Sequence, residues 1–169
     1  MLGLLRFITP LNATIARLCM IVAVCGLFAI VGVVALQVFG RYVLNDTPTW
    51  AESLALVLIL YVTMLGAAVG VRDAGHIGLE SLLAMLLPEA HRIWVEILIH
   101  VLVACFGIAM AWHAGELAAS VMPYKIPNLG LPEGINHVSL SLAGGLIVLF
   151  SIEHILALLA GEKVRPAWH

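Results

Sequence analysis

The chain has 169 residues, of which 63% are hydrophobic and 11% are charged, and its mean hydropathy is +1.11. This composition leaves too few polar residues to cover a water-soluble domain, so it predicts one integral membrane domain over residues 1–169. The formal net charge of −2 excludes a basic surface for binding nucleic acid.

Long apolar stretches follow one another at about residues 15–40, 51–71, 92–115 and 136–160. Each approaches the ~20 residues that a helix needs to cross a bilayer core. We therefore expect an all-α integral membrane protein with four transmembrane helices, the first of them retained because it lacks a signal-peptide cleavage site. A shorter stretch at about residues 76–87 predicts an interfacial helix between spans two and three. Residues 1–10 are expected to lie along the inner interface.

The cations are distributed unevenly between the two sides of this arrangement. With the N-terminus in the cytoplasm, only Arg41 and Lys125 lie on the opposite side. Because segments rich in lysine and arginine stay in the cytoplasm, this distribution predicts that both termini are cytoplasmic. The cations on the cytoplasmic side are then Arg6, Arg17, Arg72, Arg92, Lys163 and Arg165.

The connection between spans one and two combines boundary residues with turn residues. Arg41 follows the first span, where a cation can snorkel, and Trp50 suits an interfacial anchor. Asn45 begins an Asn-Asp-Thr-Pro turn. Glu52 lies in the first turn of the next helix, where a carboxylate interacts favourably with the helix dipole.

Small residues predict faces at which helices approach closely. Gly66 and Gly70 form a GxxxG pair in the second span. The third span has small residues at every fourth position, which are Gly107, Ala111, Gly115 and Ala119. The segment between spans three and four contains Pro123, Pro127 and Pro132, and it predicts an ordered, semi-rigid outer loop.

Ionisable side chains inside spans three and four are the candidate functional groups, because such groups are costly in a membrane. They are Glu96, His100, Glu153 and His154. We interpret them as a polar clasp that joins the two spans. A proton relay, a metal site and a haem held between His100 and His154 are the alternatives, and a haem would make the chain a subunit or anchor of a redox complex.

The sequence lacks the glycine-rich motifs that bind nucleotides, and it lacks the G-x-S-x-G, H-E-x-x-H and C-x-x-C motifs. We therefore do not expect an enzyme. A self-sufficient small exporter is a further alternative. Spans one and two contain no charged residue deep within them, so an accessory subunit fits the sequence better.

Two segments resemble the small membrane subunit of tripartite ATP-independent periplasmic (TRAP) transporters, the DctQ family. The first matches the pattern RYxxNxxxxWxEE through Arg41, Tyr42, Asn45, Trp50 and Glu52. The second, LGAA…R…GHI, corresponds to residues 65–68, Arg72 and residues 75–77. Ser53 stands where the family often has a second acidic residue. The resemblance covers the whole chain.

This resemblance implies a scaffold subunit of a sodium-driven secondary transporter that imports an organic anion, such as a dicarboxylate or a sialic acid. Its partners would be a large multi-span membrane subunit, a periplasmic substrate-binding protein and the lipids of the bacterial inner membrane. No cofactor is expected on this chain, because sodium would bind to the large subunit.

The resemblance and the topology together imply roles for individual residues. Arg41 and Glu52 are expected to pair across the first outer loop. His76 and Glu80 would orient the interfacial helix or contact the large subunit. The outer loop is the candidate docking patch for the binding protein, through Tyr124, Lys125, Asn128 and Glu133.

Overall fold

The computed structural model describes residues 2–73, 89–161 and 164. These residues form α1 (Leu2–Phe39), the π-helix η1 (Gly40–Leu44), α2 (Thr49–Asp73), α4 (Glu89–Val121) and α5 (Gly134–Ala160). Four helices, the first of which continues α1 into η1, are long and apolar enough to cross a membrane. The expectation of an all-helical protein with four spans is confirmed for the described residues. The interfacial helix expected at residues 76–87 lies outside them.

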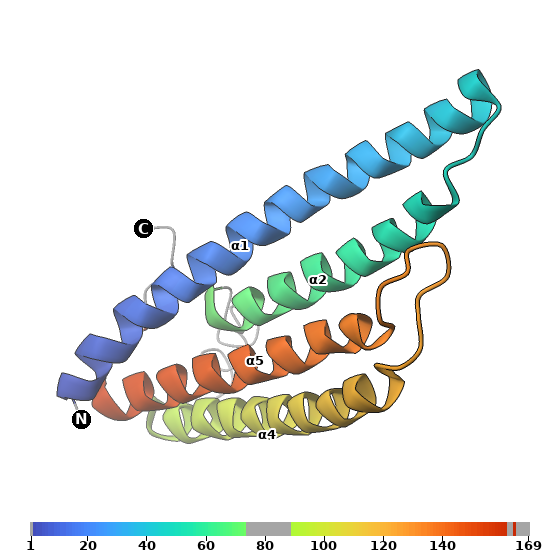
Figure 1. Cartoon of the computed structure of the whole chain (residues 1–169). Helices are drawn as coiled ribbons and strands as arrows, with labels where there is room; N and C mark the ends of the chain where they lie inside the picture. The colour runs from blue at the N-terminus through green and yellow to red at the C-terminus, as the bar shows by residue number, and fades with distance from the viewer. Residues whose placement is uncertain (1, 74–88, 162–163, 165–169) are drawn as a thin grey trace.

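Consecutive helices run in opposite directions (Figure 1). The α1–α2 connection and the loop between α4 and α5 therefore lie at one end of the molecule, which we call the loop end. The start of α1 and the end of α5 lie at the opposite end, which we call the terminal end.

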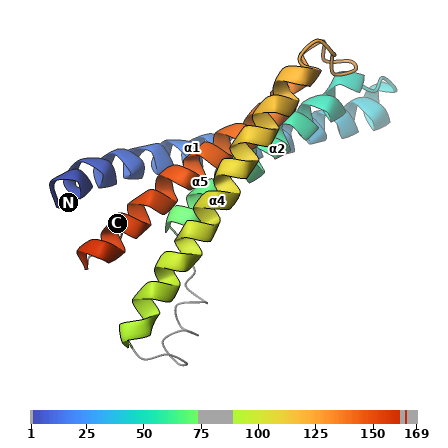
Figure 2. The same cartoon turned by 90° about the horizontal axis from the view of Figure 1, so that it is seen from below.

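The helices form an open row. α2 packs between α1 and α5, and α4 packs on α5. Among the described residues α4 has no packing contact with α1 or α2. In Figure 2 the starts of α1 and α4 lie far apart, so the helices spread toward the terminal end. This arrangement leaves long helix faces without a neighbour among the described residues.

α1 is one continuous helix that passes through Pro10. The sequence predicted an interfacial segment at residues 1–10 and a first span from about residue 15, whereas the structure shows no break between them. Proline removes one backbone donor, but membrane helices tolerate it. Thr14 Oγ1 donates to the carbonyl of Pro10 at 2.9 Å. The continuous helix carries Asn12 to the side of α5.

The end of the first span is shaped by a glycine and an asparagine. Asn45 caps the end of η1, and its φ of 52° is left-handed, a conformation that asparagine tolerates better than most residues. The backbone N–H groups of Asn45 and Asp46 both donate to the carbonyl of Gly40. A Cβ atom at Gly40 would lie 2.7 Å from the carbonyl oxygen of Asp46. The chain therefore folds back over a position that only glycine fits without strain.

α4 and α5 cross at glycines. A Cβ atom at Gly144 would lie 2.6 Å from the backbone nitrogen of Ala111 and 2.7 Å from the carbonyl oxygen of Gly107. Ser141 Oγ donates to the carbonyl of Ala111 at 2.9 Å. Part of the small-residue face predicted in the third span is therefore packed on α5, in the way that small residues join membrane helices.

The buried core is small and centred on α5. It consists of Ala16, Ala68, Val69, Ala143, Ile147 and Phe150. In the most apolar stretch of α5, 39% of residues are buried, against 6% in that of α1. Large apolar side chains such as Phe28 and Trp112 face outward, with exposures of 73% and 67%. Lipid or partner helices must cover such faces, because contact between large apolar surfaces and water is unfavourable.

Candidate functional site

A charged pair is buried where the last turn of α2 meets α5, near the terminal end. Arg72 is 2% exposed and Glu153 is fully buried. Arg72 Nε donates to Glu153 Oε2 at 3.0 Å, and Nη2 donates to Oε1 at 3.1 Å. A guanidinium matches a carboxylate in this two-bond geometry. Loss of Arg72 would leave the buried Glu153 carboxylate without a cation, so the pair holds α2 and α5 in one register.

Neighbouring side chains extend this pair into a cluster. Asn12 on α1 is fully buried, and its Nδ2 donates to Glu153 Oε2 at 2.9 Å. Asp73 accepts a hydrogen bond from Arg72 Nη1 at 2.7 Å. The Phe150 ring lies 6.0 Å from the guanidinium carbon of Arg72, within cation–π range. The cluster therefore joins α1, α2 and α5.

Two histidines connect this cluster to α4. The rings of His100 and His154 are stacked, with centroids 4.5 Å apart and planes 4° from parallel. His154 Nε2 lies 3.0 Å from the backbone carbonyl of Arg72. A carbonyl only accepts, so this nitrogen is the donor.

The side chains expected to form a clasp between spans three and four are arranged differently. Glu153 bonds to Arg72 and Asn12, which belong to the second and first spans. Glu96 accepts from Arg92 Nε of its own helix at 2.7 Å. Of the expected set, the stacked pair of His100 and His154 is the contact that bridges α4 and α5 in the described residues. The cation that faces Glu153 is Arg72 of α2, whereas Arg92, the cation of α4, bonds to Glu96 of its own helix.

The histidine pair does not have the geometry of a haem site. Two histidines that bind one haem iron hold the porphyrin between them, whereas these rings contact each other directly. The Nε2 atom of His154 is also engaged with the Arg72 carbonyl. Residues 2–73 and 89–161 contain no group of three His, Cys, Asp or Glu side chains that could hold a metal ion.

The loop between α4 and α5 is an ordered hairpin. The N–H of Ile126 donates to the carbonyl of Leu131 at 2.8 Å, and the N–H of Glu133 donates to that of Tyr124 at 2.8 Å. Asn128 has a φ of 64°, which turns the tip. The side chains expected to form a docking patch are all exposed, and they are Tyr124, Lys125, Asn128 and Glu133.

Two hydroxyl groups of α2 anchor this hairpin and the start of α5. Ser53 Oγ donates to the carbonyl of Pro127 at 3.0 Å. The Tyr61 hydroxyl donates to the carbonyl of Ile135 at 3.0 Å. An ionised acidic residue in place of Ser53 cannot donate to a carbonyl, so the serine makes a bond that a carboxylate would not. Sequence analysis missed both anchors, because their acceptors are backbone atoms about seventy residues away.

A groove of about 300 Å³ lies at the loop end between α2, the hairpin and the start of α5. Its lining residues are Glu52, Ser53, Leu56, Val57, Ile126, Pro127, Glu133 and Asn136. The expected pair of Arg41 and Glu52 is not formed, and no ion pair joins these two exposed residues in the structure. α2 instead presents Glu52 to the groove, together with Glu133 from the residue before α5. We call this the acidic groove.

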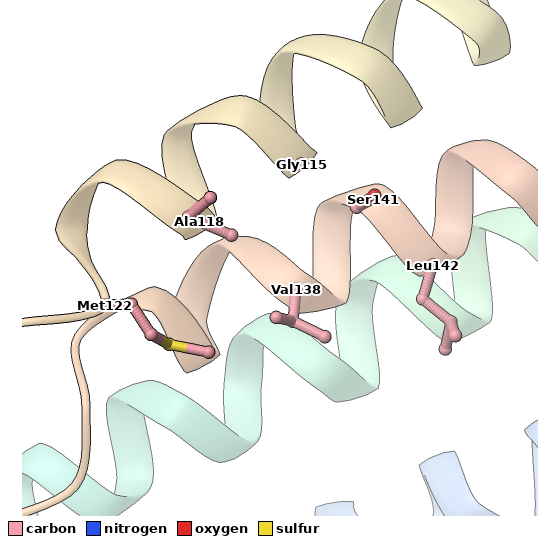
Figure 3. Close-up of a pocket in the computed structure, with 7 residues that line it drawn as sticks. Gly115, Ala118, Met122, Val138, Ser141 and Leu142 are labelled. Carbon is pink, nitrogen blue, oxygen red and sulfur yellow. The ribbon is translucent and has the colours of Figure 1, made fainter.

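A second groove, of about 400 Å³, lies on the crossing of α4 and α5 near the hairpin. Figure 3 shows Ala118 and Met122 of α4 along it, with Val138, Ser141 and Leu142 of α5. Gly115 and Ala119 complete the lining, so no charged side chain borders this groove.

Several other residues named from the sequence take no part in these sites. Nothing in the described chain lies within 4 Å of a Cβ atom placed at Gly66 or Gly70, so the GxxxG face is open. Trp50 is 41% exposed at the start of α2. His76 and Glu80 lie outside the described residues.

Comparison with known proteins places this arrangement in a family. The family model described as tripartite ATP-independent periplasmic transporters, DctQ component, matches residues 30–161. This region includes η1, α2, α4, the hairpin and α5, with the buried pair of Arg72 and Glu153. The match therefore covers the greater part of the chain.

Two individual proteins are similar to the chain. The sialic acid TRAP transporter small permease protein SiaQ of Vibrio cholerae is 26% identical over 135 residues, which are 78% of this chain and 75% of that protein. The sialic acid TRAP transporter permease protein SiaT of Haemophilus influenzae is 36% identical over 75 residues, which are 44% of this chain and 12% of that protein. With the family model matching across residues 30–161, the chain belongs to the DctQ component family of the TRAP transporters.

Proposed function

We propose that this chain is the scaffold subunit of a sodium-driven TRAP transporter in the bacterial inner membrane, with both termini in the cytoplasm. It pairs with a large membrane subunit that carries the sodium and substrate sites. A soluble periplasmic binding protein delivers an organic anion to the loop end. The similarity to two sialic acid transporter proteins favours a sialic acid over a dicarboxylate as that anion.

The observation that carries this proposal is the distribution of charge. The buried cation Arg72 is bonded to Glu153 and Asp73, so it offers no free charge to an anion. One groove is bordered by carboxylates, which repel an anion, and the other has no charged lining. Neither groove nor the buried cation of the described residues thus suits an anion, which supports substrate binding by another subunit.

Exposed apolar faces support the pairing with a large membrane subunit. The helices form an open row (Figure 1). Side chains such as Phe28 and Trp112 are exposed within the described chain. The partial match to the much longer SiaT permease supports the same pairing, because a segment similar to part of this chain is found within that protein.

Purification from the native membrane tests the proposal. A tagged chain extracted in mild detergent should bring with it a large multi-span protein in near-equal amount, identified by mass spectrometry. Liposomes containing both proteins should then import a sialic acid only when they have an inward sodium gradient and the soluble binding protein outside.

Other results would contradict the proposal. A redox enzyme in the purified sample, or a haem absorption band, would support the cytochrome alternative. A stable homodimer that transports by itself in liposomes would support the small-exporter alternative.

A further inference from the structure

The acidic groove has carboxylates without cationic partners. Glu52 and Glu133 are exposed, both line the groove, and neither forms an ion pair within the part of the chain that the structure describes. Asn136 lines the same groove, and its buried Oδ1 atom lacks a hydrogen-bond donor in the structure.

The rest of the groove is apolar. Leu56 and Val57 of α2 form one wall, and Ile126 and Pro127 of the hairpin form another. Ile126 is only 8% exposed, so this wall is part of the folded structure and not a loose surface. Lysine and arginine side chains combine an apolar stem with a head that only donates hydrogen bonds. A groove with apolar walls and acceptor oxygens has the complementary chemistry.

Hydrogen bonds within the chain hold the walls of the groove together without a partner. The hydrogen bond from Ser53 to Pro127 fixes the hairpin wall to the α2 wall. The bond from Tyr61 to Ile135 fixes the start of α5, which carries the remaining side, to α2. A preformed site avoids the cost of ordering its own walls when a partner binds.

We infer that the acidic groove receives one arginine or lysine side chain of the soluble binding protein during docking. This inference rests on the proposed function, because it needs a binding protein that docks at the loop end. Glu52 lies in the first turn of α2 and Glu133 immediately precedes α5, so both carboxylates are at the helix ends. Charges at such solvent-facing positions steer association and suit a partner that must leave after each transport cycle.

A charge-reversal experiment tests the groove in the assembled transporter. The chain and its large subunit are placed together in lipid nanodiscs, and the affinity of the fluorescently labelled binding protein is measured at low and at high salt. The double variant Glu52→Lys and Glu133→Lys should weaken docking about tenfold or more at low salt, since it removes both acceptors of the incoming charge. Its affinity should also fall less steeply with added salt than that of the wild type.

Glu116→Lys supplies a matched control. Glu116 is also an exposed glutamate near the loop end, 62% exposed at its side chain, and it does not line the groove. The same change of charge at that position should alter the affinity by less than about twofold, because exposed charges outside the contact contribute little. An equal loss in the control and in the groove variant would overturn the inference, since it would show a general charge effect.

A photo-crosslink identifies the occupant directly. With p-benzoylphenylalanine in place of Leu56, illumination of the docked complex should join this chain to a peptide of the binding protein that contains an arginine or a lysine. A crosslink to the large subunit or to lipid alone, or loss of the large subunit from the double variant, would overturn the inference. Failure of the wild-type complex to bind any binding protein would instead contradict the proposed function.

Discussion

Arg72 donates two hydrogen bonds to Glu153 within the buried part of the molecule, so the stability that each residue contributes depends on the other. Arg72→Met alone should lower the free energy of unfolding by about 3–5 kcal/mol, because it leaves the buried Glu153 carboxylate without a cation. Glu153→Leu alone should cost less, because Arg72 keeps its ion pair with Asp73. The double variant should recover most of that loss. Chemical unfolding in detergent micelles measures all three, with Glu116→Gln as an exposed control. A double variant as unstable as the sum of the single ones would contradict this account.

Gly40 and Gly32 lie in the same first span but have different surroundings. A Cβ atom at Gly40 would meet the carbonyl of Asp46 at 2.7 Å, whereas one at Gly32 has nothing within 4 Å. Gly40→Ala should therefore destabilise the protein by about 1–3 kcal/mol through overpacking. Gly32→Ala should be neutral or stabilise it by up to about 1 kcal/mol, because alanine favours a helix. Thermal unfolding in micelles compares the two, and equal effects would show that the turn does not need glycine.

At the scale of elements, the close approach of α4 and α5 requires that the Gly144 side of α5 face α4. Gly144 lies against α4, whereas a Cβ atom at the adjacent Gly145 has nothing within 4 Å. Gly144→Val should separate the two helices and cost about 1–3 kcal/mol of stability. Gly145→Val should leave the thermal midpoint of the isolated chain nearly unchanged. A reversed order of the two variants would mean that α5 is rotated relative to the structure.

Sequence reasoning at the element scale worked best where it depended on hydropathy and residue size. The apolar stretches at about residues 51–71 and 136–160 correspond to α2 and α5, because the bilayer sets the length of a span. The first helix is longer than predicted, since the segment expected along the inner interface continues through Pro10 as part of α1. The small-residue face of the third span predicted packing but did not identify α5 as the partner.

At the scale of the whole molecule, the topology is the first property to measure. The hairpin and the α1–α2 connection share one end, so the orientation of one loop fixes that of the other (Figure 1). In a variant whose native cysteines are replaced by serine, Asn128→Cys should react with a membrane-impermeant maleimide in intact spheroplasts. Val164→Cys should react only after permeabilisation, because the distribution of arginine and lysine predicts cytoplasmic termini. The reverse labelling pattern would invert the proposed orientation.

The sequence by itself determined the class of protein, the number of spans, and the family resemblance. These properties follow from local quantities, namely the length and hydropathy of each stretch and the identity of motif residues. The hydropathy of the fourth stretch also predicted that Glu153 and His154 lie inside the fourth helix, and both residues are in α5.

Only the tertiary structure decided the partners. Glu153 pairs with Arg72, 81 residues earlier, and with Asn12, 141 residues earlier. Glu52 lines the same groove as Glu133 and does not pair with Arg41. The physical reason is that a buried charge is stabilised by whichever opposite charge or donor the packing brings within hydrogen-bond distance. That choice depends on the rotation and depth of every helix, which hydropathy and motif spacing do not specify.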